Sequence, residues 1–366
     1  MKRALDGVIG ALARFPGDPI DLLVGEPCFQ PPAEIVEAFA KVAWEPVSGY
    51  GPPAGLLRLR EILAEHSPGG RTSADNLVVT HGAKGALLAL FASLVEPGDE
   101  VIHPLPCYPA YPAMVRRFGG VPIGVAETDA GFSGWAASVA ARVGPRTRVV
   151  VLSSPSNPSG STLSRDDLFA LTALCADHGV RLVLDEAYSA FRFDARADSN
   201  DDFGPDRTLI RIGSASKGLA LPGWRIGWIV ADSELVNRVT GVQSALLNPP
   251  ATPPQRAMLA LPEVPEEYFE DNQRAVLHRL EAMVEIMTGA GFHAVMPDGG
   301  FYLWVDIRDR LENVSSAGWC EGLAREHGVG LWPGEDYGVP GFVRLALPQG
   351  DDWREKVAEL GRRLVR

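Results

Sequence analysis

The stretch Ser214-Ala215-Ser216-Lys217, followed across residues 218–224 by Arg225-Ile226-Gly227-Trp228, decides the fold of this chain. Lys217 lies between the end of an expected strand and a turn rich in glycine and proline, among hydroxyls and few charges. Burial of a lysine favours its neutral amine, which can attack an aldehyde. Ser214, Ser216 and Arg225 supply hydrogen bonds and a planar positive fork, which suit a phosphate dianion. The alternative for the same residues is a strand followed by an ordinary loop.

Upstream of this stretch, from Asp75 to Val230, short apolar runs alternate with stretches of helical period. This alternation predicts βαβ units and a mostly parallel sheet in an α/β domain. Runs such as residues 149–152 are apolar throughout, as expected for strands covered by helices on both faces. The expected strands are Leu77 to Thr80, Glu100 to His103, Val121 to Val125, Arg148 to Leu152, Arg181 to Asp185 and Thr208 to Gly213.

Downstream of Pro254 the pattern changes to that of a second, smaller α+β unit. We expect a long helix, two strands and a closing helix, at Glu266 to Ala290, Phe301 to Asp306, Phe342 to Ala346 and Asp351 to Val365. The proline-rich stretch 248–254 can be neither helix nor central strand, so it marks a boundary loop. Residues 1–35 and 260–366 are assigned to the small domain and residues 36–259 to the large one. Residues 194–206, which are acidic, are expected to form an exposed loop.

The composition excludes several classes of partner. The 366 residues include 46 acidic and 34 basic side chains, a formal charge of -12, which repels phosphate backbones and anionic membranes. We therefore expect no nucleic-acid or membrane partner. The four cysteines form no Cys-x-x-Cys pair, so no metal site is expected. No stretch reaches the roughly 18 apolar residues of a membrane helix, and no signal peptide is expected, which favours a cytoplasmic protein.

Around Lys217 the sequence resembles the lysine signature of class I and II aminotransferases, the fold-type I enzymes related to aspartate aminotransferase. The resemblance implies a large domain with a mostly parallel seven-stranded sheet and a smaller α+β domain. It also implies that Lys217 holds pyridoxal 5'-phosphate as a Schiff base.

Two further motifs follow expected strands, at the sheet edge where ligands bind in α/β proteins. Asp185 resembles the family's acid that keeps the pyridine nitrogen protonated, because only the pyridinium withdraws electrons strongly. Outside the family, Asp-Glu after a strand is more often metal-binding or solvated. The turn around Asn157 resembles the family's Asn-Pro-x-Gly turn, which implies that Asn157 and Tyr188 donate to the cofactor's phenolic oxygen.

The turn from Thr80 to Ala86 joins a strand to a helix through small residues, which leaves backbone N–H groups free for an anion. We expect Gly82, Ala83 and Lys84 to complete the phosphate site. Lys84 is either a helix-surface residue or a substrate contact, and both alternatives stay open.

The resemblance assigns four more residues. Tyr108 matches the aromatic that lies flat on the pyridine ring, and Tyr50 a tyrosine that reaches the neighbouring subunit's phosphate in a homodimer. Gly25 matches a turn that lines the substrate site, together with Asn157. Arg344 matches the arginine that grips the substrate's α-carboxylate through a bidentate fork. On its own, an arginine in a strand is more often part of a structural ion pair.

The implied function is an aminotransferase acting on an α-amino acid and a 2-oxo acid, with Lys217 as anchor and general acid/base. Lyase, elimination or cyclisation reactions on the same fold are the alternatives. Carbon–sulfur lyases commonly follow Asp-Glu with Ile-His, whereas this chain has Ala187-Tyr188. Residues 243–254 show no clear arginine for a second substrate carboxylate, so the sequence leaves the side-chain specificity open.

Overall fold

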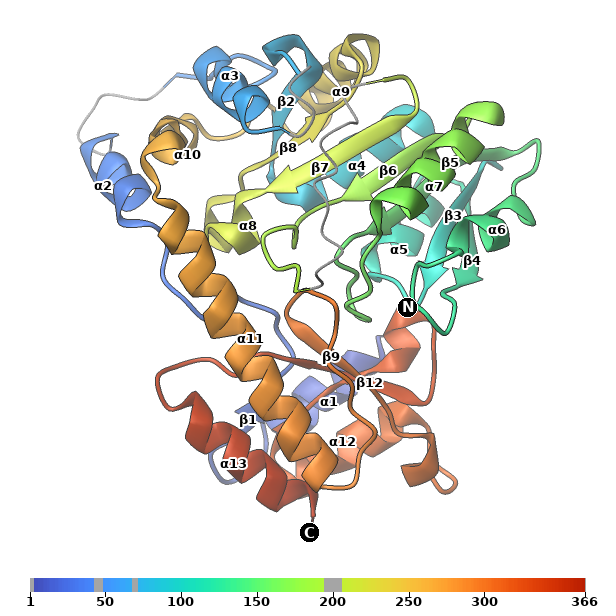
Figure 1. The fold of residues 1–366 in the computed structure, drawn as a ribbon, viewed down its shortest axis with the longest axis vertical. Helices are drawn as coiled ribbons and strands as arrows, with labels where there is room; N and C mark the ends of the chain where they lie inside the picture. Colours follow the sequence, from blue (N-terminus) through green and yellow to red (C-terminus); the bar gives the residue numbers. More distant parts are fainter. Residues whose placement is uncertain (1–2, 43–48, 68–71, 194–205, 366) are drawn as a thin grey trace.

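The computed structural model describes residues 3–42, 49–67, 72–193 and 206–365 (Figure 1). The part of the chain at the top of Figure 1, called the upper unit below, is built on a seven-stranded sheet. The strand order of this sheet is β2-β8-β7-β6-β5-β3-β4. All neighbours pair in parallel except β8, which is antiparallel to both β2 and β7. The strands are β2 Leu77–Thr80, β3 Glu100–Leu105, β4 Val121–Ala126, β5 Thr147–Ser153, β6 Arg181–Asp185, β7 Leu209–Ser214 and β8 Gly227–Val230. The predicted α/β class with a mostly parallel sheet is confirmed, although β8 was not among the expected strands.

Helices cover both faces of this sheet, which explains the uninterrupted apolar strands. Val149 and Val151 of β5 pack into one core cluster with helices α4, α5 and α9, whereas Val150 and Leu152 pack into another with α6 and α7. Every residue of β5 from 149 to 152 is therefore buried, whichever way it points. The covering helices are α4 Gly82–Leu94, α5 Ala110–Arg117, α6 Trp135–Ala140, α7 Arg165–Asp177 and α9 Ser233–Leu246.

A third cluster packs short helices against the edge strand β2 and its neighbour β8. These helices are α2 Ala33–Val42, α3 Leu57–Glu65, α10 Thr252–Ala257 and the 3-10 helix η3 Met258–Glu263. The prediction that the proline-rich stretch contains no helix is wrong at its end, because Pro253 and Pro254 lie in the first turn of α10. The backbone nitrogens of a first helical turn need no partner within the helix, so proline is tolerated there.

The lower unit contains both terminal regions and one continuous core cluster. Helix α11 (Glu266–Gly289) runs down into it from the upper unit, as Figure 1 shows. Its two small sheets have the orders β11-β12-β9, all antiparallel, and β1-β10, parallel. The remaining elements of this unit are α1 Ala4–Leu12, β1 Ile20–Asp21, β9 Tyr302–Asp306, η4 Arg308–Arg310, α12 Ser316–His327, β10 Val329–Gly330, β11 Trp332–Pro333, η5 Gly334–Tyr337, β12 Phe342–Ala346 and α13 Trp353–Leu364.

The predicted long helix, two strands and closing helix of this unit agree with α11, β9, β12 and α13 to within two residues at each end. The domain assignment to residues 1–35 with 260–366, and to residues 36–259, stays a proposal. The predicted loop 194–206 lies outside the described residues except for its last position.

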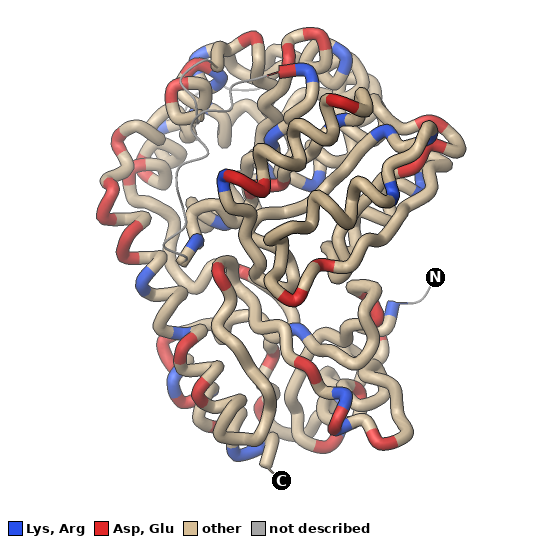
Figure 2. The backbone as a smooth tube through the Cα atoms, turned by 45° about the vertical axis from the view of Figure 1, so that its right-hand side comes forward, with Lys and Arg blue, Asp and Glu red and all other residues tan. Residues whose placement is uncertain are grey.

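Charged positions lie along both units. In the view of Figure 2, the Lys and Arg positions of the described chain are interspersed with Asp and Glu rather than gathered on one face. Across the same described residues, none of the helices combines the length and apolar character needed to cross a bilayer.

Candidate active site

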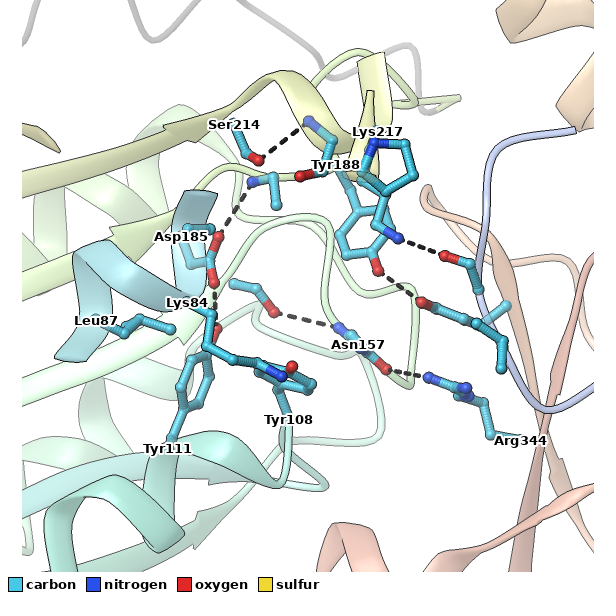
Figure 3. Close-up of a pocket in the computed structure, with 18 of the residues that line it drawn as sticks. Lys84, Leu87, Tyr108, Tyr111, Asn157, Asp185, Tyr188, Ser214, Lys217 and Arg344 are labelled. Carbon is cyan, nitrogen blue, oxygen red and sulfur yellow. Dashed lines mark hydrogen bonds between the residues drawn. The ribbon is translucent and has the colours of Figure 1, made fainter. Parts of the chain in front are cut away.

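A cavity of about 280 Å³ lies between the two units, bounded by the carboxyl ends of β5, β6 and β7 on one side and by β11 and β12 on the other (Figure 3). The sheet ends place polar side chains there, as expected for an α/β fold. The predicted residues that line it are Gly25, Ala83, Lys84, Tyr108, Asn157, Asp185, Tyr188, Ser214, Ser216, Lys217, Arg225 and Arg344. Its other lining residues are Val24, Leu87, Tyr111, Ser153, Ala187, Pro222, Tyr302 and Trp332.

Lys217 reaches the cavity from the single-turn helix α8 (Ala215–Gly218), which follows β7 directly. The hydroxyl of Ser214 begins this turn by accepting a hydrogen bond from the backbone nitrogen of Ser216 at 3.1 Å. The amine of Lys217 donates to the carbonyl oxygen of Gly25 and lies 5.7 Å from the centroid of the Tyr188 ring. A carbonyl of the lower unit thus orients the amine of the upper unit.

Asp185, the last residue of β6, is a buried carboxylate with two hydrogen-bond donors. The Tyr111 hydroxyl donates to Oδ2 at 3.0 Å, and the Ala187 backbone nitrogen donates to Oδ1 at 3.2 Å. Burial raises the pKa of Asp185 to about 6, while the hydrogen bonds from Ala187 and Tyr111 act to lower it. At neutral pH this carboxylate is charged in a desolvated place, so it favours a cationic partner. Tyr111 was not predicted as a site residue.

Arg344 of β12 is 2% exposed and reaches the cavity from the lower unit. One terminal nitrogen donates to Asn157 Oδ1 at 3.1 Å, and the other donates to the carbonyl of Leu23. Among the described residues no carboxylate pairs with Arg344, which contradicts the alternative of a structural ion pair there. Its guanidinium therefore retains donors for an anion.

Asn157 lies in the turn after β5, where its backbone nitrogen donates to the Ser153 hydroxyl at 3.2 Å. Figure 3 shows its side chain beside the Arg344 guanidinium and below the Tyr188 ring. The turn therefore joins the edge of the large sheet to Arg344 of the lower unit.

The Tyr188 and Tyr302 hydroxyls lie 2.6 Å apart in a hydrogen bond. Burial raises the pKa of Tyr188 well above its ordinary value, so its phenol stays protonated. Tyr302 was not predicted as a site residue. A Cβ on Gly25 would lie 2.0 Å from the Tyr302 oxygen, so this close approach requires glycine at position 25.

Arg225 and the start of α4 form the opposite end of the cavity. The Arg225 backbone is left-handed, with φ at 57°, and its guanidinium donates to the carbonyls of Pro222 and His81 at 2.7 and 3.1 Å. Gly82 lies behind it without lining the cavity, and a Cβ there would approach Arg225 to 2.6 Å. The first turn of α4 thus presents free backbone nitrogens beside a guanidinium, a strong combination for binding an anion.

Lys84 and Tyr108 lie together on the cavity wall, with the Lys84 amine 5.8 Å from the Tyr108 ring centroid. The Tyr108 ring in turn meets Tyr111 edge to face, with centroids 5.7 Å apart. Tyr50 is different: its side chain is 87% exposed and does not line the cavity of this chain.

The cavity is rich in positive charge. Four cationic side chains line it, whereas Asp185 is the only carboxylate among the lining residues. The cations are Lys84, Lys217, Arg225 and Arg344. Such a site suits a ligand, or a pair of ligands, that carries several anionic groups.

Comparisons with known proteins agree with this geometry. The family model "Aminotransferase class I and II" matches residues 17–362. Aspartate/prephenate aminotransferase of Thermus thermophilus is 34% identical, with 93% of this chain and 90% of the relative covered. The arginine–pyruvate transaminase AruH of Pseudomonas aeruginosa is 35% identical, with 97% and 92% covered. A solved structure of Thermus thermophilus aspartate aminotransferase superposes with a TM-score of 0.91 at 30% identity, covering 99% of this chain and 97% of that one. The resemblance predicted from the lysine motif is confirmed: this chain is a fold-type I protein that belongs to the class I and II aminotransferase family, whose members transfer amino groups.

Proposed function

We propose that this aminotransferase uses pyridoxal 5'-phosphate and moves an amino group between an α-amino acid and a 2-oxo acid. The observation that carries the proposal is a single cavity that combines the Lys217 amine, the buried Asp185 carboxylate and an Arg344 guanidinium with no carboxylate partner among the described residues.

The residues present fit this cofactor at both of its ends. Arg225, Ser214, Ser216 and the first turn of α4 would hold its phosphate, because they supply a guanidinium, hydroxyls and backbone N–H groups. Asp185 would pair with the ring nitrogen, since its carboxylate is buried and has no cationic partner of its own among the described residues.

The part of the cavity between the phosphate site and Asp185 fits the remaining atoms of the pyridine ring. Asn157 and Tyr188 would donate to the ring oxygen, and Tyr108 would cover the ring face. When bound there, the cofactor would supply an electron sink for the substrate's α-carbon.

Lys217 and Arg344 would act on the substrate itself. Lys217 would hold the cofactor through its amine and, once released, would act as the general base and acid at the substrate's α-carbon. Its bond to the Gly25 carbonyl directs the amine into the cavity. Arg344 would hold the α-carboxylate, with its guanidinium turned toward the cavity by Asn157 and Leu23. Lys217 and Arg344 would thus hold the substrate in a fixed orientation, and such positioning can supply a large part of an enzyme's rate enhancement.

The lyase, elimination and cyclisation alternatives receive no support from the comparisons. The most similar relatives are named as aminotransferases or transaminases, and Ala187-Tyr188 differs from the Ile-His that carbon–sulfur lyases commonly have.

For the substrate class, we favour amino acids with a second, acidic group. Lys84 lines the cavity and has no acidic partner among the described residues, so it remains available after Arg225 and Arg344 have bound their anions. Relatives named as aspartate or aspartate/prephenate aminotransferases agree with this choice. A cationic substrate such as arginine, used by one relative according to its name, would be repelled by the same lysine.

We further propose a cytoplasmic homodimer with shared sites. The proposal is supported by Tyr50, which is 87% exposed and does not line the cavity of its own chain. The four cysteines are free thiols, which suits a reducing compartment.

The test is a single-turnover assay of the cofactor-loaded enzyme with aspartate, glutamate, alanine and arginine, followed by identification of the products. We expect the acidic amino acids to react fastest and to yield their 2-oxo acids. Lys84→Gln should remove this preference while leaving the reaction with alanine nearly unchanged. Release of ammonia with an eliminated side chain, in place of amino transfer, would contradict the proposed function.

A further inference from the structure

We propose that Asp336 is a positioning residue for the α-carboxylate site, acting through the indole of Trp332 on Arg344. The proposal rests on the proposed role of Arg344 in holding the substrate's carboxylate.

The Asp336 carboxylate, in the 3-10 helix η5, binds three donors from two parts of the chain. Oδ1 accepts from the backbone nitrogen of Ala4 at 3.0 Å, and Oδ2 accepts from that of Leu5 at 3.1 Å. Oδ2 also accepts from the indole nitrogen of Trp332 at 3.0 Å. The residue before α1 is Arg3, whose side chain contains no acceptor, so Asp336 caps the helix from a distant segment.

Trp332 links this carboxylate to the site. Its backbone pairs directly with that of Arg344 in the antiparallel register of β11 and β12. Its ring lines the cavity, and the Arg344 guanidinium carbon lies 4.5 Å from the ring centroid. The pairing of β11 with β12 therefore fixes the backbone position of Trp332. The hydrogen bond to Asp336 fixes the rotation of the indole ring. A rotated ring would leave the indole N–H without its partner.

The orientation of the Arg344 guanidinium plane depends on three aromatic rings that contact it, of which Trp332 is one. Tyr302 and Tyr337 also lie against it, with centroids 4.0 and 5.3 Å from the guanidinium carbon. Aromatic rings cover the faces of the group, so a carboxylate must approach along its edge, where paired N–H donors lie in one plane. Any tilt of the plane misaligns both hydrogen bonds at once.

The segment that follows α1 contacts Arg344 directly. The chain continues from α1 through β1 to Leu23, whose carbonyl accepts from Arg344. Two residues later the carbonyl of Gly25 accepts from Lys217. These two carbonyl contacts come from the segment after α1 and do not involve Asp336, so Asp336→Ala and Leu5→Ala leave both acceptors in the chain.

The experiment compares cofactor-loaded Asp336→Ala, Trp332→Phe and the double variant with the native enzyme. The readouts are KM and kcat for the preferred amino acid and the Kd of maleate, a dicarboxylate that does not react, by calorimetry. We expect Asp336→Ala to raise KM and the maleate Kd about tenfold, the effect of losing one buried hydrogen bond, with a much smaller change in kcat. Because Asp336 acts through the indole N–H, the double variant should show little more than the effect of Trp332→Phe alone.

Leu5→Ala is the matched control, because it weakens the packing of α1 but leaves the bond between Asp336 and Trp332 in place. We expect it to lower Tm with the maleate Kd unchanged. If Leu5→Ala raises the Kd as much as Asp336→Ala at a similar loss of Tm, the effect belongs to helix stability and the proposal is overturned. If Asp336→Ala does not fold, Trp332→Phe decides, since it retains the cap of α1, and an unchanged Kd would overturn the proposal.

Arg344→Lys separates this proposal from the proposed function. A maleate Kd that rises in Arg344→Lys but not in Asp336→Ala refutes the positioning role alone. A Kd unchanged in Arg344→Lys refutes the carboxylate site itself.

Discussion

Tyr111 donates its phenolic hydrogen to Asp185 across 3.0 Å, within the core beneath the cavity. Burial raises the pKa of Tyr111 well above its ordinary value, so the phenol is protonated at neutral pH and can donate. Burial also raises the pKa of Asp185 to about 6, and the bonds from Ala187 and Tyr111 oppose that rise. Tyr111 thus helps to keep the carboxylate charged at neutral pH.

Tyr111→Phe should therefore move the ionisation of Asp185 to higher pH. Loss of a hydrogen bond to a charged group, about 1.5 to 3 kcal/mol, corresponds to roughly one to two pH units. The pH below which the apo-protein loses affinity for pyridoxal phosphate should rise by this amount, as measured by calorimetric titration. Tyr108→Phe is the control, since Tyr108 meets Tyr111 by ring contact and makes no bond to Asp185. An unchanged pH profile in Tyr111→Phe would show that Asp185 does not govern binding.

Asp185→Asn should stabilise the apo-protein at neutral pH although it impairs catalysis. The pKa of Asp185 is about 6 in the folded state against 3.8 as its ordinary value, so the folded state binds this proton more tightly. The ionised carboxylate therefore destabilises the fold, by an amount that grows as pH rises from about 4 to 6 and is constant above that. Removing the charge should raise the free energy of unfolding by about 3 kcal/mol at neutral pH, and by little near pH 4.

Denaturant unfolding of both apo-proteins across this pH range measures the difference. A gain that is equal at both ends would contradict a titrating Asp185. Once loaded with cofactor, the asparagine variant should lose most of its activity, because a neutral amide cannot keep the ring nitrogen protonated.

Lys217→Ala should abolish turnover while the fold remains intact. The described contacts of the Lys217 amine are the Gly25 carbonyl and the face of the Tyr188 ring, so little packing is lost. Loss of the general base alone costs roughly 10²- to 10⁴-fold, and loss of the covalent anchor adds to it. Circular dichroism and Tm should match the native protein. Lys84→Ala, the loss of another cavity lysine, should retain turnover of alanine; equal inactivation of both variants would argue against a special role for Lys217.

Several residues that line this cavity could be predicted because each carries a local signal. Lys217, Asp185 and Asn157 follow apolar strands at the sheet edge, and the structure brings all three to one cavity. The strands themselves are buried on both faces, which makes their apolar runs distinct. Strand β8 was missed because it has four residues, and the first two of them, Gly227 and Trp228, belong to the motif that follows Lys217.

Tyr111, Tyr302 and Trp332 could not be predicted as part of the site, since an aromatic residue in a helix or strand is ordinarily part of a core. Tyr302 bonds to Tyr188, which is 114 positions away, and Trp332 approaches Arg344 only through the pairing of β11 and β12. Tyr111 had one local clue: it stands three residues after Tyr108, the spacing of neighbours on a helix face, although helix α5 begins between them.

Tyr50 should act across a subunit interface. Its exposed side chain lines no part of its own chain's cavity, so Tyr50→Phe should weaken cofactor binding only if a partner presents it. In a mixed dimer of Tyr50→Phe and Lys217→Ala, one of the two sites has both native residues, and activity should partly return after mixing. Homodimers of each variant, treated identically, are the control. A fully active monomer would refute the shared site.

The Arg344→Lys variant tests whether the enzyme recognises the α-carboxylate of its substrate. The native guanidinium presents paired donors in one plane, whereas lysine offers a single point charge. KM for the amino acid should therefore rise. The value of kcat should fall as well, because a loosely held carboxylate lets the α C–H bond tilt away from the amine of Lys217, and a misplacement of about 1 Å can cost roughly a hundredfold.

A carboxylate-free amine is the matched probe for Arg344→Lys. Such amines should be poor substrates of the native enzyme, since they leave the buried Arg344 donors without an anion, and they should react almost equally well with the variant. The ratio of kcat/KM for the amino acid to that for the amine, measured in both proteins, isolates the contribution of the carboxylate contact. If the ratio is the same in both, Arg344 serves only to join β12 to Asn157 and Leu23, and the α-amino acid assignment loses its main support.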